Sequence, residues 1–234
     1  MLSIKGLTFS YAESAPLFEG VSVELPADGF HGIAGRSGIG KSTFARVLAQ
    51  ELQPDSVETL LTPSKTLYCA GDERLPRWQR VKNHLESVCP SGRQDVLADL
   101  RRAFDIDSMW DRDVQALSTG ELARVNVLRY VLQDCDLLIL DECLSTVDQG
   151  RRRRVLAALK MLATSRGQSI LYISHQIADT VAFSCSIIHM HSDGNGPALL
   201  RVLPGYDAET FPENTAEVLR SATYEVLAGG QVVS

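Results

Sequence analysis

One run of nine residues constrains the fold of this chain more than any other feature. It reads Gly35-Arg36-Ser37-Gly38-Ile39-Gly40-Lys41-Ser42-Thr43 and fits the pattern GxxxxGK[ST]. The flanks suit the pattern as well, because Phe30–Ala34 is typical of a short strand and apolar residues recur at helical spacing from Phe44 to Leu52. The glycines are therefore predicted to lie between the end of a strand and the start of a helix.

That position suits the binding of phosphate groups. Gly38 and Gly40 allow the backbone to turn tightly and to aim N–H groups at phosphate oxygens, at the positive end of a helix. Lys41 can reach the β- and γ-phosphates of a nucleotide, and the Ser42 hydroxyl can ligate Mg²⁺. The alternative, an ordinary glycine-rich turn, is disfavoured by the strand and helix on either side. We expect nucleotide contacts from Gly35, Arg36, Ser37, Gly38, Ile39, Gly40, Lys41, Ser42 and Thr43.

Composition narrows the class of protein. The chain has 234 residues, 44% of them hydrophobic and 22% charged, which is ordinary for a soluble globular protein. A formal net charge of −6 argues against a nucleic-acid-binding surface over the whole molecule. No apolar run approaches the roughly 20 residues of a membrane span, and Met1–Lys5 does not resemble a signal peptide, so we expect a cytosolic chain. The cysteines are scattered and contain no CxxC pair, which argues against a disulfide framework or a zinc site and favours a reducing cell interior. They are Cys69, Cys89, Cys135, Cys143 and Cys185.

The apolar patterns predict an α/β core with a parallel sheet. Leu137–Leu140 is a continuous apolar run, as expected of a parallel strand buried on both faces. Helix, strand, helix and strand alternate from Gly120 to Ile173, which is typical of a parallel sheet. Residues 2–34 alternate short apolar runs with turns, as antiparallel strands do. The charged segment Arg77–Asp113 is irregularly helical and is expected to be an inserted subdomain.

A second set of polar residues follows the Leu137–Leu140 strand. Asp141 and Glu142 come where a buried strand ends, beside the predicted phosphate-binding loop. There Asp141 can hold Mg²⁺ through water, and Glu142 can polarise a water for in-line attack on the γ-phosphate. The alternative is a strand that ends in two solvated acids, a weaker interpretation once the phosphate-binding loop lies upstream.

These motifs, in this order, resemble those of the ATP-binding cassette (ABC) ATPases. Leu117–Glu121, which reads LSTGE, is similar to the LSGGQ signature of that family, and Ser145–Asp148 is similar to its D-loop. His175 follows the next strand, where the family has its switch histidine. Tyr11 lies where the family stacks an aromatic ring on adenine. The resemblance covers about residues 2–190.

The resemblance implies a P-loop ABC ATPase core with a parallel sheet, an N-terminal antiparallel β-subdomain and an inserted helical subdomain. It implies one domain over residues 1–234, with the helical insertion at about 77–118 and a C-terminal extension at about 192–234. The extension contains a candidate strand, Leu199–Leu203, and a candidate helix, Thr215–Leu227.

The family pairs two cassettes head to tail around two ATP molecules, which gives further residues a role by resemblance. Ser118 and the backbone N–H of Gly120 would contact the γ-phosphate held by the opposite cassette, at a helix start. His175 would reach the γ-phosphate and the attacking water; the alternative is a histidine that caps a strand end. For Tyr11 the alternative is core packing at the end of a strand.

The chain departs from the family pattern at several positions. Thr119 replaces a glycine of the signature, and Glu121 replaces glutamine, a change that the family tolerates. Cys143 stands where a proline is usual. Gly71–Val81 resembles the Q-loop region of importer cassettes, with Gly71 at the position of the glutamine. Glycine has no side chain to hold Mg²⁺ or water, a role that Asp72, Glu73 or Gln79 would have to fill.

Two classes of function compete. The first is the ATP-hydrolysing subunit of a membrane transporter, on the cytoplasmic face of the membrane and favoured as an importer by the Leu75–Val81 resemblance. Its partners would be an integral membrane permease, a second cassette and a substrate-binding protein. The second is a soluble ABC ATPase of DNA repair or the ribosome, disfavoured because the chain has one cassette and no heptad run. A cassette that binds ATP and hydrolyses it weakly is a third alternative, raised by Gly71 and Thr119.

The run Arg151–Arg154 also raises the possibility of nucleic-acid binding. Four arginines that open a helix would spread around it, and the chain as a whole is acidic. A solvated helix start is the simpler interpretation, so a nucleic-acid partner is not expected.

Overall fold

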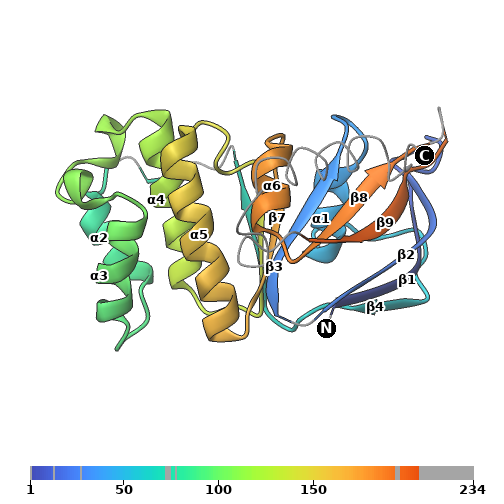
Figure 1. Cartoon of the computed structure of the whole chain (residues 1–234), viewed down its shortest axis with the longest axis horizontal. Helices are drawn as coiled ribbons and strands as arrows, with labels where there is room; N and C mark the ends of the chain where they lie inside the picture. Colours follow the sequence, from blue (N-terminus) through green and yellow to red (C-terminus); the bar gives the residue numbers. More distant parts are fainter. Residues whose placement is uncertain are drawn as a thin grey trace, which may run out of the picture.

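A six-stranded sheet forms the centre of the computed structural model, which describes residues 2–205 except 13, 27, 72–74, 77 and 193–195 (Figure 1). Its strand order is β5-β6-β7-β3-β8-β9, parallel except that β9 runs antiparallel to β8. The strands are β3 (Gly29–Gly35), β5 (Thr66–Ala70), β6 (Leu137–Asp141), β7 (Ser169–Ile173), β8 (Ser186–His191) and β9 (Leu199–Pro204). Only β7 separates β3 from β6, so the segments that follow these two strands emerge at the same edge of the sheet.

A smaller antiparallel sheet, in the order β2-β1-β4, contains β1 (Leu2–Phe9), β2 (Phe18–Leu25) and β4 (Thr59–Leu61). The antiparallel prediction for residues 2–34 is confirmed for β1 and β2 and is wrong for β3. The physical reason is burial: Phe30–Ala34 is buried on both faces, as a central parallel strand must be. Helix α1 (Lys41–Leu48) packs with Phe44 in the core that the two sheets share.

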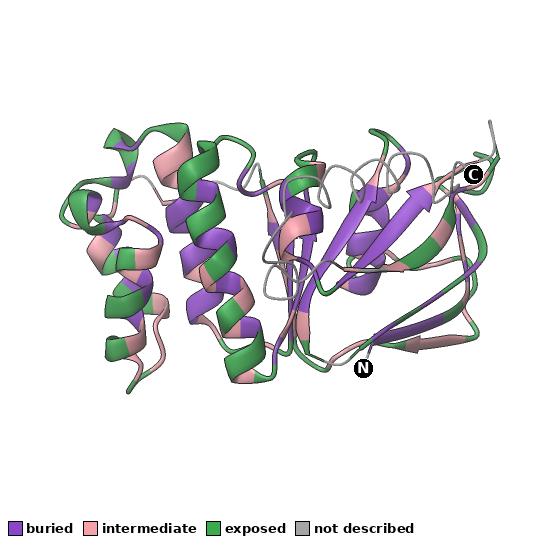
Figure 2. Cartoon of the chain, in the orientation of Figure 1, coloured by how far each residue is buried: buried purple, intermediate pink, exposed green. Residues whose placement is uncertain are grey.

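The remaining helices gather on the other side of the central sheet (Figure 1). They are α2 (Val81–Val88), α3 (Gln94–Ala103), α4 (Thr119–Leu132), α5 (Gln149–Arg166) and α6 (Ile177–Phe183), with 3-10 turns at Asp107–Met109 and Val114–Ala116. Helix α5 has a buried face with Val155, Leu156 and Leu159, and an exposed face (Figure 2). The described part of the segment 77–118 therefore consists of short helices joined by turns and loops, while its status as an inserted subdomain stays a prediction.

The C-terminal part of the chain is described only as far as Gly205. The predicted strand Leu199–Leu203 is confirmed as part of β9, which pairs with β8. The predicted helix Thr215–Leu227 lies outside the described residues. Among the helices of the described ranges, none has both the length and the apolar character that crossing a bilayer requires.

Candidate nucleotide-binding site

The predicted phosphate-binding loop connects β3 to α1, as the sequence pattern indicates. Gly38 and Gly40 have φ angles of 79° and 108°, in the left-handed region that favours glycine. Gly40 is also the N-cap of α1, and a Cβ there would lie 3.0 Å from the side chains of Leu17 and Phe18. Both predicted glycines are therefore required by backbone conformation, and Gly40 by space as well.

Lys41 opens α1 and folds back over the loop. Its Nζ donates hydrogen bonds to the carbonyls of Gly35 and Arg36, each at 2.9 Å. Burial lowers the pKa of Lys41, while the nearby carboxylates of Glu142 and Asp141 oppose that shift. A cation is thus held within the electrostatic reach of both acids that follow β6.

Asp141, the last residue of β6, is 5% exposed and offers one free oxygen. Its Oδ2 accepts a 2.7 Å hydrogen bond from the Tyr68 hydroxyl, whereas its Oδ1 has no hydrogen-bond partner within the described ranges. Burial, followed by this contact with Asp141, raises the pKa of Tyr68. Sequence analysis missed Tyr68, because its role depends on β5 pairing with β6, which no local pattern predicts.

Glu142 has a φ of 55°, an uncommon conformation for a residue with a side chain. His175 faces its carboxylate, with Nε2 of the ring 3.3 Å from Oε1, within ion-pair distance. Burial raises the pKa of Glu142, and Asp141 adds to the rise, while His175 and Lys41 counteract it. The following residue, Cys143, is buried and its thiol donates to the Cys69 carbonyl at 2.8 Å, which ties this turn to β5.

These elements meet around a cleft of about 860 Å³. Ser42 from α1, Asp141 and Glu142 all line it. A hydroxyl and a buried carboxylate oxygen without a partner are hard oxygen donors, the kind that Mg²⁺ prefers. The residues present therefore fit a magnesium ion at the positions that the sequence predicts.

Gly71 lies on the wall of the same cleft. A Cβ at this position would lie 2.8 Å from the backbone oxygen of Glu142, closer than real Cβ atoms approach backbone. The glycine is thus explained by its close approach to Glu142. Of the three residues considered as substitutes for the missing glutamine, Gln79 is engaged with His84, because its Oε1 accepts a 3.1 Å hydrogen bond from Nδ1 of that ring. Asp72 and Glu73 lie outside the described residues.

Tyr11 lies beside the phosphate-binding loop. Its hydroxyl is 2.8 Å from the Thr43 hydroxyl on α1, and its ring packs edge-on against Phe9 with 5.1 Å between centroids. The residue is 49% exposed, so it is not a core side chain. The structure places Tyr11 on the rim of the loop with part of its surface open to a ligand.

Ser118 and Gly120 lie elsewhere, at a second groove of about 350 Å³ that is shared with Thr146, Val147 and Asp148. Ser118 is the N-cap of α4 and forms a reciprocal capping box with Glu121. A Cβ at Gly120 would lie 2.9 Å from the Thr146 carbonyl, so this glycine lets α4 approach the D-loop. Within one chain, the signature residues are thus not brought together with the phosphate-binding loop.

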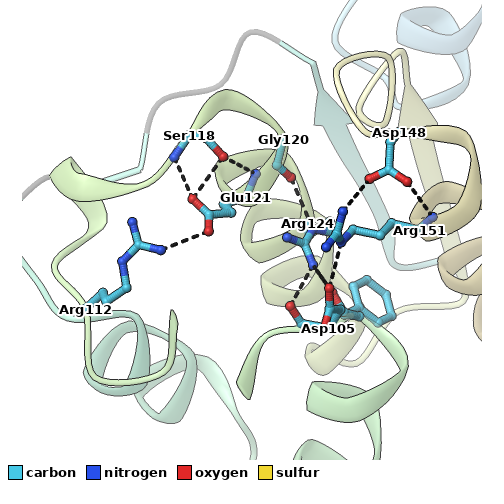
Figure 3. Close-up of polar contacts among 9 residues, drawn as sticks. Asp105, Arg112, Ser118, Gly120, Glu121, Arg124, Asp148 and Arg151 are labelled. Atoms are coloured by element: carbon cyan, nitrogen blue, oxygen red, sulfur yellow. Dashed lines mark hydrogen bonds and ion pairs between the residues drawn. The ribbon is translucent and has the colours of Figure 1, made fainter. Parts of the chain in front are cut away.

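The groove is bordered by an ion-pair network centred on Asp105 (Figure 3). The Asp105 carboxylate lies 3.3 Å from Arg124 of α4 and accepts a 2.7 Å hydrogen bond from Arg151 of α5. Arg151 also pairs with Asp148, the N-cap of α5, at 3.0 Å. These contacts join the end of α3, the signature helix and the D-loop.

The expectation that Arg151–Arg154 is a solvated helix start is wrong for part of the run. Arg152 is buried, pairs with the buried Asp179 at 2.7 Å and donates to the Val147 carbonyl at 2.9 Å. Arg153 pairs with the same carboxylate at 2.8 Å. Arg151, Arg152 and Arg153 thus pair with acids of the same chain, which accounts for most of the arginine run in an acidic protein.

A loop between a parallel strand and a helix, with two acids at the end of a nearby strand, defines a P-loop nucleotide-binding protein of the α/β class. The chain belongs to the ABC transporter family, whose model matches residues 18–145. The fold class predicted from the sequence, with a parallel core sheet and an N-terminal antiparallel sheet, is confirmed.

Similar proteins are of several kinds. The molybdenum import ATP-binding protein ModC of Aliivibrio fischeri is 30% identical over 72% of this chain, which spans 50% of the ModC length. The aliphatic sulfonates import ATP-binding protein SsuB 2 of Pseudomonas aeruginosa is 31% identical, with 80% of this chain and 70% of SsuB 2 aligned. The archaeal ribosome recycling factor aABCE1, solved with stalk protein aP1, is 23% identical with a TM-score of 0.73, over 94% of this chain and 41% of aABCE1. At that identity, the last likeness shows the fold alone.

Proposed function

We propose that this chain is the ATP-hydrolysing subunit of an ABC importer, held on the cytoplasmic face of a membrane by its permease. The observation that carries the proposal is the cleft in which Ser42, Asp141 and Glu142 meet, with the Lys41 cation beside both acids. An import function is supported by the relatives ModC and SsuB 2, both named as import ATP-binding proteins.

Each residue of the cleft has a chemical task in this proposal. The N–H groups of the Gly35–Thr43 loop and Lys41 bind the phosphates, and Tyr11 stacks on the adenine ring. Ser42 and Asp141 hold Mg²⁺, which supplies charge neutralisation on the phosphates when it is bound. Glu142 accepts the proton of the attacking water, a task suited to a half-buried carboxylate with a raised pKa. His175, 3.3 Å from Glu142, orients that carboxylate and the γ-phosphate.

A second cassette is part of the proposal. Ser118 and Gly120 line a groove separate from the cleft of Ser42 and Asp141, so they cannot complete the same phosphate site within one chain. A head-to-tail pair brings each signature groove to the partner's phosphate-binding loop. The N-terminal turn of α4 offers backbone N–H groups that suit an anion there.

ATP hydrolysis and dimerisation are tested together with the purified chain. We expect phosphate release that requires Mg²⁺, and a dimer that forms with ATP and dissociates after hydrolysis, measured by light scattering. A monomer at all ATP concentrations would contradict the head-to-tail arrangement. ATP binding without phosphate release would favour the weakly hydrolysing cassette.

The transporter role needs a separate experiment. The tagged chain is isolated from solubilised membranes and from the soluble fraction of its native cells, and the proteins that co-purify are identified by mass spectrometry. An integral membrane permease, with or without a substrate-binding protein, is expected. Recovery with ribosomes or DNA-repair proteins instead would overturn the importer proposal in favour of a soluble ABC ATPase.

A further inference from the structure

The signature serine is already engaged within its own chain. Glu121 bends back over the start of α4, and its Oε2 accepts hydrogen bonds from the Ser118 backbone N–H at 2.8 Å and from the Ser118 hydroxyl at 2.9 Å (Figure 3). The hydroxyl oxygen in turn accepts from the Glu121 N–H at 3.4 Å. A hydroxyl has a single proton to donate. A phosphate that binds Ser118 must therefore compete with a carboxylate for that proton.

The competing group is an anion beside an anion-binding site. The bonds from the Ser118 N–H and hydroxyl, together with Arg112, lower the pKa of Glu121, so this carboxylate is ionised at neutral pH. Like charges at such short range repel and disfavour binding. A glutamine, the usual residue of the family at this position, would keep the capping bonds without the charge.

The two arginines that line the groove, Arg124 and Arg151, form contacts with groups other than Glu121. Arg124 donates to the carbonyls of Phe104 and Asp105, at 2.8 and 2.6 Å. Arg151 is bound by the carboxylates of Asp105 and Asp148. These two arginines are thus matched by two acids.

Arg112 is placed to offset the Glu121 charge. Its Nη1 donates to Glu121 Oε1 at 2.9 Å, on the oxygen that Ser118 does not use (Figure 3). Its Nη2 donates to the Ala116 carbonyl. The Arg112 backbone is anchored as well, because its carbonyl accepts from the N–H of Val81 at 3.0 Å. A guanidinium anchored in this way keeps its bond to the Glu121 carboxylate when Ser118 gives up its own bonds to that carboxylate.

We propose that Arg112 is a positioning residue of the signature site: it holds and neutralises the Glu121 carboxylate so that Ser118 can bind the γ-phosphate carried by a second copy of the chain. The inference rests on the proposed function, since it requires an ATP-dependent dimer. Arg112 acts through Glu121 and does not itself touch the nucleotide.

The test compares four variants in a Glu142→Gln background, which keeps ATP intact: Arg112→Ala, Glu121→Gln, the double variant and Arg102→Ala as control. Arg102 forms an exposed pair with Asp99 on α3, 3.3 Å apart. Analytical ultracentrifugation with saturating Mg²⁺-ATP gives the dimer dissociation constant, and calorimetry at concentrations where the chain is monomeric gives ATP affinity. Thermal melts confirm that each variant is folded.

We expect Arg112→Ala to weaken dimerisation roughly tenfold, because each symmetric dimer loses the Arg112 guanidinium charge at two signature sites. The affinity of the monomer for ATP should be unchanged. Adding Glu121→Gln should restore dimerisation, and Glu121→Gln alone should leave it as strong as the parent or stronger. Arg102→Ala should have no effect.

A purely structural role for Arg112, through the Ala116 carbonyl, predicts that the double variant stays as weak as Arg112→Ala, and that result would overturn the inference. Weaker dimerisation of the single variant Glu121→Gln would also overturn the inference, because removing the carboxylate charge should not weaken the dimer. If the Glu142→Gln parent itself remains monomeric with ATP, the proposed function fails and the inference fails with it. If the parent is a dimer with ATP and all the variants dimerise equally well, the inference is refuted while the proposed function stands.

Discussion

The hydroxyl of Tyr11 lies 2.8 Å from that of Thr43, which joins the turn after β1 to the first turn of α1. This bond, with the edge-on contact to Phe9, fixes the orientation of a half-exposed aromatic ring next to the phosphate-binding loop. A ring fixed before the ligand arrives loses little entropy on stacking.

The first prediction concerns this ring. Tyr11→Ala should weaken ATP binding about fivefold to a hundredfold, since base–aromatic stacking contributes about 1–3 kcal/mol. Tyr11→Phe keeps the ring and should lose much less. Calorimetry with ATP and with inorganic tripolyphosphate separates the effects, because only the ligand with a base should lose affinity. An equal loss for both ligands would assign Tyr11 to the structure of the loop.

The second prediction concerns Lys41. Lys41→Ala removes a cation that faces both acids of the cleft, and a charge-assisted contact of about 1.5–3 kcal/mol implies a loss of about tenfold to a hundredfold in ATP affinity. Lys65→Ala, an exposed lysine at the opposite end of the sheet, is the control. Unchanged affinity in Lys41→Ala would show that Gly35–Thr43 is not the phosphate site.

The third prediction uses the raised pKa of Glu142. Glu142→Gln should retain ATP binding, nearly abolish phosphate release and trap the ATP-bound dimer, because an amide cannot accept the proton of the attacking water. Wild-type turnover in this variant would refute the assignment.

The same substitution has a consequence for stability. A carboxyl with a raised pKa favours its neutral form in the folded state, so ionised Glu142 destabilises the fold as pH rises through that pKa. Glu142→Gln should therefore melt at a higher temperature than wild type at pH 7. The difference should shrink as pH falls and vanish below the ordinary glutamate value of about 4.3, where the carboxyl is protonated in both the folded and the unfolded state. A melting-temperature difference that is independent of pH would contradict this account.

The fourth prediction tests the space at Gly71. Gly71→Ala introduces a Cβ 2.8 Å from the Glu142 carbonyl and should displace the Glu142 backbone. Turnover should fall about tenfold to a hundredfold, as expected for a catalytic group moved by a fraction of an ångström to 1 Å, while ATP affinity is retained. Gly196→Ala is the matched control, because its Cβ would meet no atom within 4 Å. Wild-type turnover in Gly71→Ala would mean that the Glu142 turn accommodates a side chain.

The fifth prediction separates the arginines of Arg151–Arg154. Arg152→Ala leaves the buried Asp179 with its charge only partly matched by Arg153 and should destabilise the fold by up to about 3–5 kcal/mol. Exposed Arg154→Ala should stay within about 0.5 kcal/mol. Urea unfolding measures both, and equal effects would refute the buried role of Arg152.

Sequence reasoning succeeds here where the chemistry is local. The glycines at 38 and 40, the strand before Asp141 and the helix start at Ser118 each depend on neighbours within a few residues, so a pattern is enough to predict them. The order β5-β6-β7-β3-β8-β9 brings these pieces together, and the prediction of a parallel sheet required only the alternation of strand and helix.

Long-range contacts account for what the sequence does not predict. Tyr68 and Asp141 are 73 positions apart, and their hydrogen bond depends on β5 lying next to β6. The space that excludes a side chain at Gly71 is defined by the Glu142 backbone, and the burial of Arg152 by Asp179 on α6. No periodicity in the sequence contains that information.

Asp105 gives the helical end of the molecule a mechanical link to the D-loop. One carboxylate holds guanidinium groups from α4 and α5, and Arg151 passes the link to Asp148. A movement of α3 away from α5 would break these ion pairs, which join the turn after α3 to the start of α5. In the proposed dimer, the Asp105 turn would therefore connect the end of α3 to the surface that faces the second cassette.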